Sequence, residues 1–329
     1  MEEKYIPPYE ITDKMLELVS EIMENLGKFS SVENLGRLPR LRRANRIKSI
    51  HSSLAIENNT LSIEQVTDVI NGKRVLAPQK DILEVQNAFK AYERLSEINP
   101  YSIGDLLKIH GIMMEGLVKE AGQFRSGQVG VYNKDGKVVH LAPPAKFVPE
   151  QISFLFDWVK ESATNMLIKS SVFHYEFEFI HPFNDGNGRT GRLWQTVLLT
   201  SWKPIFAWIP IESIVKDNQK KYYEAITLST SQGKSNIFIE FMLDVINKAI
   251  KNIIRDAQNH YNHISNQIME LMKVVENYPQ SALELMEKLN LKSRVGFRKN
   301  YLQPALKAGL IEMTNPDKPT SKNQKYFKK

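Results

Sequence analysis

The stretch HPFNDGNGRTGR, residues 181–192, is the densest polar and glycine-rich segment of the chain, and it directly follows the apolar run FEFI. His181 precedes Pro182, and the residue before a proline disfavours helical backbone, so we predict that a helix ends near Ile180. We expect that helix to begin at Ser170 and the next one to run from Arg189 to Thr200. The glycine-rich turn therefore lies between two helices.

The residues of this turn are suited to binding an anion. Gly186, Asn187 and Gly188 let the backbone turn so that its N–H groups converge at a helix start, where the helix dipole also favours negative charge. Arg189 and Arg192 are three residues apart, so they share a helix face and add charged donors. The segment thus predicts a cradle for an anion.

An acid and a histidine complete the segment. Asp185 is unfavourable beside an anion unless a cation such as Mg²⁺ lies between them and bridges phosphate oxygens. Histidine titrates near neutral pH, so His181 can remove a proton from an incoming hydroxyl. A solvated loop is the common meaning of GNGR alone, but twelve residues in this order favour transfer from a magnesium-bound nucleotide to a hydroxyl.

At these residues the sequence resembles the Fic family, whose signature HPFxDGNGRxxR is matched at every defined position. The resemblance extends from about Leu35 to Lys251. It implies a mainly α fold, a helical bundle with a β-hairpin flap beside the active-site loop. It also implies transfer of AMP from ATP to a Ser, Thr or Tyr hydroxyl of a protein, with release of pyrophosphate.

The resemblance also implies a role for each site residue. His181 would be the base, Phe183 an apolar anchor of the loop, and Asp185 the Mg²⁺ ligand. ATP would be held at its phosphates by Gly186, Asn187 and Gly188, at its β/γ end by Arg189, at its γ-phosphate by Arg192, and at its adenine by Tyr222 and Tyr223. Aromatic residues at helical spacing are equally compatible with a core, so the two tyrosines keep both interpretations.

A second stretch, SSLAIENN at residues 52–59, matches the inhibitory pattern (S/T)xxxE(G/N) of the same family through Ser53 and Glu57. Residues 40–57 are predicted to be helical, with Glu57 near the end. A bidentate contact between its carboxylate and Arg192 would occupy the donor that the γ-phosphate needs. The alternative is that Glu57 merely ends a helix.

The segment GQVGVYNKDGKVVHLAPP, residues 127–144, has short β-prone runs around Asn133-Lys134-Asp135-Gly136, which is a hairpin signal. The resemblance makes residues 129–141 the flap, and its first strand, Val129, Gly130, Val131 and Tyr132, would pair with an extended segment of the target. A plain surface hairpin is the alternative.

Apolar residues at three- and four-residue steps predict further helices over 82–95, 106–117 and 237 to about 275. Pro279 marks the predicted boundary between a Fic domain at 1–278, with its core at about 100–230, and a second domain at 279–329. In that domain we expect helices at 281–289 and 293–308, a stop at Gly309, and two strands joined by a polar loop. This order resembles a winged helix-turn-helix domain.

The basic residues gather in that second domain. Residues 290–329 hold ten Lys and Arg against two acidic residues, a local charge of +8 within a chain of net charge +7. Arg294, Arg298 and Lys299 on the second helix, with Lys318, Lys322 and Lys325 in the wing, are suited to contacting DNA phosphates. A protein-docking module or a solvated tail remains an alternative.

Composition limits the other possibilities. The chain has no cysteine, which excludes disulfides, thiolate zinc sites and a cysteine nucleophile. Neither a signal peptide nor a membrane span is indicated, so we expect a cytoplasmic protein without membrane contact. Two alternatives to a simple transferase stay open: a DNA-binding regulator whose Fic portion senses nucleotide, and an enzyme that also removes AMP. The chain itself could be a target, and a homodimer is compatible with the sequence.

Overall fold

The computed structural model describes residues 5–31, 39–132, 138–262, 266–319 and 321–329. The chain divides into two compact units, one reaching to Asn252 and the other made mainly of residues 253–329. Each unit has its own core. None of the helices in the described ranges is long and apolar enough to cross a membrane.

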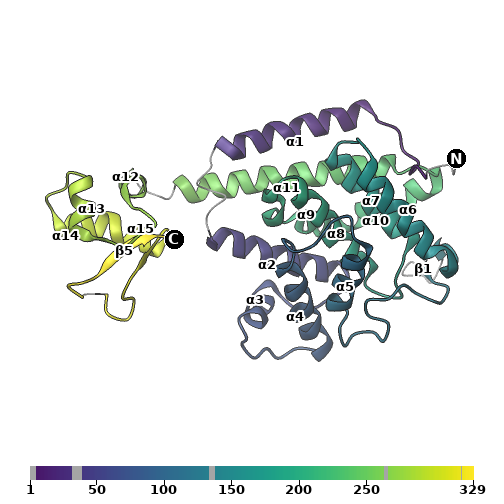
Figure 1. Ribbon diagram of the computed structural model, residues 1–329, viewed down its shortest axis with the longest axis horizontal. Coiled ribbons are helices and arrows are strands. Elements are labelled where there is room, and N and C mark those ends of the chain that lie inside the picture. The colour runs from purple at the N-terminus through teal and green to yellow at the C-terminus, as the bar shows by residue number, and fades with distance from the viewer. Residues whose placement is uncertain (1–4, 32–38, 133–137, 263–265, 320) are drawn as a thin grey trace. The chain divides into compact units, whose positions relative to one another are not determined.

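The N-terminal unit is built almost entirely from helices (Figure 1). They are α1 (Asp13–Ser31), α2 (Pro39–Ile56), α3 (Ile63–Ile70), α4 (Gln79–Glu93), α5 (Ile103–Met113), α6 (Val148–Glu161), α7 (Met166–Ile180), α8 (Asn187–Trp202), α9 (Ile211–Asp217), α10 (Gln219–Gln232) and α11 (Asn236–Asn262), with short 3-10 helices η1 (Ala145–Phe147) and η2 (Pro204–Trp208). The mainly α fold predicted from the sequence is therefore confirmed.

Helices α7 and α8 form the centre of this unit. Phe173 and Phe177 of α7 and Trp194 of α8 are fully buried in one core that also takes side chains from α2 to α6. α7 begins at Met166, ahead of the predicted Ser170, because the side chain of Asn165 accepts a hydrogen bond from the N–H of Leu167 and caps the helix there. The two central helices thus leave the loop 181–186 between them on a rigid base.

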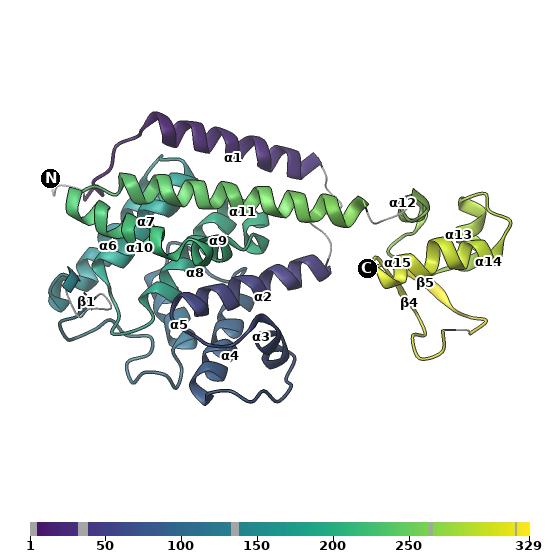
Figure 2. The ribbon, with the colours of Figure 1, turned by 180° about the vertical axis from the view of Figure 1, so that it is seen from behind.

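Helix α1 runs beside α11 along its length, as both ribbon views show (Figure 2). Thr12, just before α1, donates a hydrogen bond of 2.8 Å to Glu240, and Lys251 near the other end donates one of 2.8 Å to Glu21. One turn further along α1, the amide groups of Asn25 and Asn247 are hydrogen-bonded at 2.9 Å in a buried position. Polar contacts therefore fix the register of two helices that are far apart in sequence.

The hairpin lies between α5 and α6. Strands β1 (Gly130–Tyr132) and β2 (Val138–Leu141) are antiparallel, and the register shifts between Val131 and Tyr132. The predicted hairpin strands are therefore confirmed, whereas the predicted turn at residues 133–136 lies outside the described residues. Gln128 ties the base of the hairpin by donating a hydrogen bond of 2.9 Å to the carbonyl of Ala142.

The C-terminal unit combines short helices with a three-stranded antiparallel sheet in the order β3-β5-β4. Its elements are α12 (Asn266–Val274), β3 (Gln280–Ser281), α13 (Ala282–Lys288), α14 (Arg294–Phe297), the π-helical segment η3 (Arg298–Leu302), α15 (Gln303–Lys307), β4 (Ile311–Met313) and β5 (Lys325–Lys328). The order of two helices followed by a two-stranded hairpin agrees with the predicted fold class.

The core of this unit begins ahead of the predicted boundary at Pro279. Ile268 and Leu271 of α12 are buried together with Phe297 and Leu302, so α12 belongs to the C-terminal core rather than to the end of a helix running to about 275. α11 itself ends at Asn262, and residues 263–265 lie outside the described residues. The spacing of apolar residues alone could not show that α11 and α12 pack into different cores, because both helices carry an apolar face.

Candidate active site

The histidine of the signature ends helix α7 in a left-handed conformation. His181 has φ 52° and ψ 60°, and its N–H donates a hydrogen bond of 2.9 Å to the carbonyl of Phe177. Its Nδ1 lies 3.3 Å from the carbonyl oxygen of Glu178. Because a carbonyl only accepts, the proton in this contact is on Nδ1, which leaves Nε2 as the basic nitrogen.

The loop after His181 is closed by Phe183 and Asn187. Asn187 accepts a hydrogen bond of 2.8 Å from the N–H of Phe183 and donates one of 2.7 Å to the carbonyl of the same residue. The ring of Phe183 is fully buried and stacks on His110, with ring centroids 3.6 Å apart. Phe183 therefore anchors the loop through its ring, and the Asn187 side chain holds the backbone of Phe183 in place.

His110 on α5 holds this loop, and no motif of the sequence marks it as a site residue. Its Nδ1 accepts from the N–H of Gly122 at 2.9 Å, so Nε2 carries the proton and donates to the carbonyl of Asp185 at 3.0 Å. Burial lowers the pKa of His110 to about 4. A neutral imidazole thus fixes the backbone of the loop.

Two glycines of the signature are required by close contacts. Gly186 has φ +84°, and a Cβ there would lie 2.6 Å from Sδ of Met114. A Cβ on Gly188 would meet the carboxylate of Glu57 and would lie 2.9 Å from Nη1 of Arg192. The space above the first turn of α8, where the sequence places a phosphate, is therefore taken by the Glu57 side chain.

Glu57 and Arg192 form an ion pair. Nη2 of Arg192 donates to Oε1 of Glu57 at 2.7 Å, and the arginine side chain is only 2% exposed. The contact is to one carboxylate oxygen and not bidentate as predicted. Nη2 also donates to the carbonyl of Ser53 at 2.9 Å, and Nε donates to the Oγ of Ser53 at 3.2 Å. Burial opposes the charge of Arg192, yet its pKa is raised because Glu57 outweighs this effect.

The end of helix α2 fixes where Glu57 lies. Asn58 adopts a left-handed conformation with φ 67°, and the N–H of Asn59 donates to the carbonyl of Leu54, as at other helix ends that are closed by a left-handed residue. Gln219 of α10 donates a further hydrogen bond of 2.9 Å to the carbonyl of Ile56. Glu57 is therefore held by its own helix end and by a neighbouring helix.

The side chain of Arg189 contacts two carboxylates in this structure. It is 4% exposed, and its Nη1 donates to Oε1 of Glu84 at 3.0 Å while Nη2 donates to Oδ1 of Asp185 at 2.9 Å. Glu84, on the buried face of α4, also accepts from Asn59 at 2.8 Å. Arg189 thus orients Asp185, and its contact with the β/γ end of ATP stays a prediction. Glu84, an acid on the core face of α4, is the partner that the sequence did not indicate.

The Asp185 carboxylate can supply one ligand to a magnesium ion. Its side chain is 52% exposed, and Oδ1 is engaged by Arg189 and by the N–H of Gly186 at 2.6 Å, which leaves Oδ2 without a hydrogen-bond partner among the described residues. The part of the chain that the structure describes contains no group of three acidic or histidine side chains arranged around a cation. A single carboxylate fits Mg²⁺, which takes most of its other ligands from phosphate and water.

Arg125 joins the signature loop to the hairpin, and no motif of the sequence marks it. Its side chain donates to the carbonyls of His181 at 2.8 Å, Gly127 at 2.9 Å and Pro143 at 2.5 Å, and its N–H donates to the carbonyl of Pro182 at 2.9 Å. The residue is 3% exposed and has no acidic partner among the described residues. A buried guanidinium thus holds both ends of the flap and the histidine peptide together.

The two tyrosines assigned to adenine have different environments. Tyr222 is 1% exposed, and its hydroxyl is 3.0 Å from Nε2 of His174, so it is a core residue and has no free face for a base. Tyr223 is 45% exposed and packs edge-on against Tyr222 at 5.3 Å. Burial and the Glu57 carboxylate both raise the pKa of Tyr223, which places it near the Glu57–Arg192 pair.

Of the flap residues, Gly130, Val131 and Tyr132 form β1, and Val129 precedes it. The assigned residues come together around one loop: His181, Asp185, Gly186, Gly188 and the Glu57–Arg192 pair. Together they define a helical protein with a glycine-rich helix start, a basic histidine nitrogen beside it, and a carboxylate placed across it.

Comparison with known proteins agrees with this class. Residues 100–199 match the model of the Fic/DOC family, and residues 266–327 match the C-terminal domain of Fic-like proteins, "Filamentation induced by cAMP protein Fic-like". A Fic family protein from Desulfovibrio desulfuricans G20 of known crystal structure is 45% identical, with a TM-score of 0.75 over 99% of this chain and 98% of that one. The chain belongs to the Fic family.

More distant relatives are named for an activity. A protein adenylyltransferase fic-1 from Caenorhabditis briggsae is 27% identical over 70% of this chain and 45% of its own length. A protein adenylyltransferase Fic from Nematostella vectensis is 28% identical over 69% of this chain and 53% of its own length. The chain thus spans about half the length of the curated relatives it matches. Fic-1 from C. elegans, 21% identical with a TM-score of 0.59 over 72% of this chain and 71% of that one, shares the fold.

Proposed function

We propose that this protein is an adenylyltransferase that transfers AMP from ATP to a hydroxyl group of a protein, and that Glu57 restrains it. The observation that carries the proposal is the position of His181, whose Nδ1 is tied to a main-chain carbonyl beside an anion-binding helix start. A protein that only senses nucleotide has no need of a basic nitrogen there. The names of the adenylyltransferase relatives support the same reaction.

The reaction follows from the groups present. Nε2 of His181 takes the proton of the target hydroxyl, and the oxygen attacks the α-phosphorus of ATP. The bond between the α-phosphorus and the bridging oxygen to the β-phosphate breaks, and pyrophosphate leaves with the electron pair. The N–H groups at the start of α8 and Arg192 hold the phosphates, and Mg²⁺ on Asp185, when bound, neutralises charge on them.

The position and the charge of the Glu57 carboxylate both explain how it would restrain adenylyl transfer. It lies over Gly188 and takes the Nη2 donor of Arg192, so a γ-phosphate directed at Arg192 meets a like charge. Nucleotide can then bind only with its phosphates displaced, unless the end of α2 moves. Opening of this ion pair is therefore the step that we assign to activation.

The flap supplies a main-chain edge for the target. An extended segment paired with β1, Gly130–Tyr132, would be held by backbone hydrogen bonds with little demand on its side chains. Modification of the protein by itself also belongs to the proposal. The need for ATP favours a cytoplasmic reaction.

Mass spectrometry of the intact protein tests the proposal. After incubation of Glu57→Gly with ATP and MgCl₂, we expect a gain of one or more AMP groups, which the double variant with His181→Ala loses. Incubation with ATP labelled at the γ-phosphate should leave no label, since that phosphate departs in pyrophosphate. A gain of phosphate instead of AMP, or a gain that survives in His181→Ala, would refute the proposed reaction.

A further inference from the structure

The C-terminal unit presents a helical stretch whose outer side is basic. α14, η3 and α15 form a continuous stretch over residues 294–307, and Phe297, Leu302 and Ala305 turn one side of it into the core. Arg294, Arg298 and Lys299 are exposed on the other side. The sequence has no acidic residue between Asn290 and Ile311, so nothing within the stretch offsets this charge.

The basic residues of this unit differ in whether an acidic residue pairs with them. Two lysines elsewhere in the unit have carboxylate partners: Lys329 pairs with Glu312 at 2.7 Å and Lys288 pairs with Glu276 at 3.6 Å. By contrast, within the described part of the chain no carboxylate lies within 4.0 Å of five basic groups, namely Arg294, Arg298, Lys299, Lys318 and Lys322. We call these five residues the basic face. Folding gains nothing from this excess of like charge, because it repels itself in the compact state.

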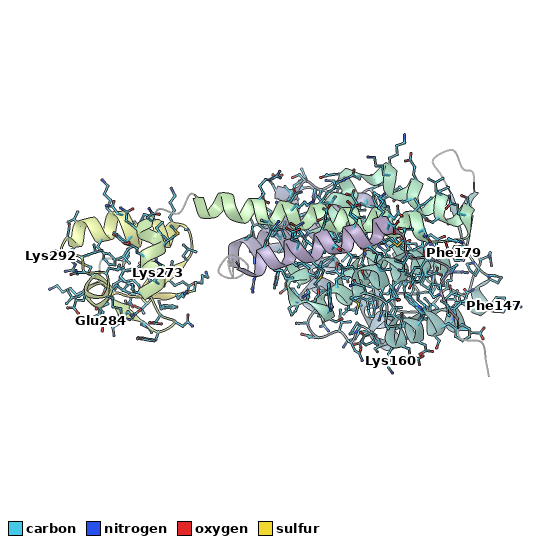
Figure 3. All side chains as sticks on the ribbon, turned by 90° about the horizontal axis from the view of Figure 1, so that it is seen from above. Phe147, Lys160, Phe179, Lys273, Glu284 and Lys292 are labelled. Atoms are coloured by element: carbon cyan, nitrogen blue, oxygen red, sulfur yellow. The ribbon has the colours of Figure 1, made fainter. Side chains whose placement is uncertain are left out.

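Two elements contribute to the basic face. The helical stretch gives three of the five residues, and the loop between β4 and β5 gives Lys318 and Lys322. Arg294 and Arg298 lie toward strand β5, because both guanidinium groups oppose the rise that burial causes in the pKa of Tyr326. The turn before the helical stretch adds Lys292, which lies at the surface of this unit (Figure 3). The basic residues of the helix and of the hairpin therefore belong to adjacent elements.

An apolar side chain interrupts the charges. Val295 follows Arg294 and is 79% exposed, although nearly all other aliphatic residues of the stretch face the core. A helix that carries arginines and one exposed apolar side chain matches the major groove of B-DNA, which offers phosphates, base-edge acceptors and thymine methyl groups. The deep, narrow major groove of A-form RNA does not admit such a helix.

We propose that the basic face binds duplex DNA, with residues 294–299 directed into the major groove and the β4–β5 loop on the phosphates. This function is separate from adenylyl transfer, because it uses only the C-terminal unit and needs neither ATP nor His181. Charge complementarity favours a polyanion over a protein partner. Phosphate contacts of this kind release counterions, so affinity must fall steeply with salt.

Fluorescence anisotropy of a labelled duplex of about 24 base pairs tests this with the full chain and no nucleotide. Five phosphate contacts predict a slope of log K against log [KCl] of about −4 to −5, with a Kd in the micromolar range at 50 mM KCl. Arg298→Ala should reduce the slope by about one unit, because it removes one phosphate contact. Lys329→Ala removes the same charge from a paired lysine and should leave the slope and affinity unchanged.

The outcomes separate the two functions. His181→Ala should bind the duplex as the wild type does, whether or not the protein transfers AMP. No rise in anisotropy up to about 20 µM protein at 50 mM KCl, as expected for a protein-docking module, would overturn the proposal. Equal effects of Arg298→Ala and Lys329→Ala would overturn the assigned face. Because Arg298 is exposed, an unchanged melting temperature of Arg298→Ala shows that the variant is folded.

Discussion

Replacing Glu57 by glycine should activate the protein. The change removes the carboxylate that lies over Gly188 and breaks its hydrogen bond of 2.7 Å with Nη2 of Arg192, which keeps its contact with the Ser53 carbonyl. Glu57 lies just after the last residue of α2, in a turn, so a glycine there interrupts no helix. The variant therefore tests the ion pair with little other disturbance of the backbone.

The size of the effect follows from the contact that is lost. A hydrogen bond between charged groups, with one partner buried and the other partly exposed, is worth about 2 to 3 kcal/mol. If ATP must break this contact before its γ-phosphate reaches Arg192, its removal should raise the initial rate roughly 30- to 150-fold. Glu57→Gln keeps a neutral hydrogen bond of about 1 kcal/mol, so it should give an intermediate rate.

The assay measures incorporation of AMP from ATP labelled at the α-phosphate, with the full chain at fixed magnesium. Glu64→Gln is the matched control, because Glu64 is an exposed acid at the start of α3 and has no contact with Arg192. Combining Glu57→Gly with His181→Ala gives the background. A rate of Glu57→Gly equal to that of the wild type, or an equal gain in Glu64→Gln, would refute the reasoning.

A thermal measurement checks the same contact without catalysis. Arg192 remains buried when its partner is removed, so unliganded Glu57→Gly should melt at a lower temperature than the wild type. Added Mg-ATP should then raise the melting temperature more in the variant, since a phosphate replaces the lost carboxylate. Equal shifts in the two proteins would show that Glu57 does not compete with nucleotide.

Three further outcomes follow from the buried groups. Arg125→Lys keeps the charge but loses the fork that binds several carbonyls. Amide exchange at residues 127–132 and 141–142 should therefore be about tenfold faster by mass spectrometry, and unchanged exchange would contradict this role. The pKa of His110 is lowered to about 4, so the histidine takes up a proton in the unfolded state at a higher pH than in the folded state. As pH falls from about 6.5 to 4, the free energy of unfolding should therefore decrease by up to about 3 kcal/mol. His110→Gln should remove this dependence from urea unfolding curves. The pKa of buried Glu176 is raised to about 7, so its effect has the opposite sign: stability is lost as pH rises from about 4.5 to 7, and Glu176→Gln should remove that loss.

Features set by neighbouring residues could be predicted from the sequence. The helix end at Ile180 follows from Pro182, the helix start near Arg189 from the glycines, and the hairpin strands from their β-prone runs. Helix α2 and the contact between Glu57 and Arg192 were also within reach, because the family pattern relates the two segments. In each case a few adjacent residues restrict the backbone to one conformation.

Features that depend on tertiary packing could not be predicted in this way. Arg125 has no acidic neighbour in sequence, and its partners are carbonyl groups, which every residue carries. The pairing of Arg189 with Glu84 joins residues 105 positions apart. Burial of Tyr222 depends on α11, whose Phe238 packs against its ring. An isolated charge or ring in a helical pattern does not reveal whether the fold provides a buried partner for it.

The conformation of His181 shows why the twelve-residue signature needs the rest of the domain. A non-glycine residue in the left-handed region costs about 1 kcal/mol or more, and this one precedes a proline, which restricts it further. The contacts that fix it come from outside the signature: Arg125 binds the carbonyls of His181 and Pro182, and His110 binds that of Asp185. Loss of these contacts would let the histidine relax toward extended backbone, and its imidazole would leave the start of α8. The chemistry of the signature is therefore set by two buried side chains that no signature position includes.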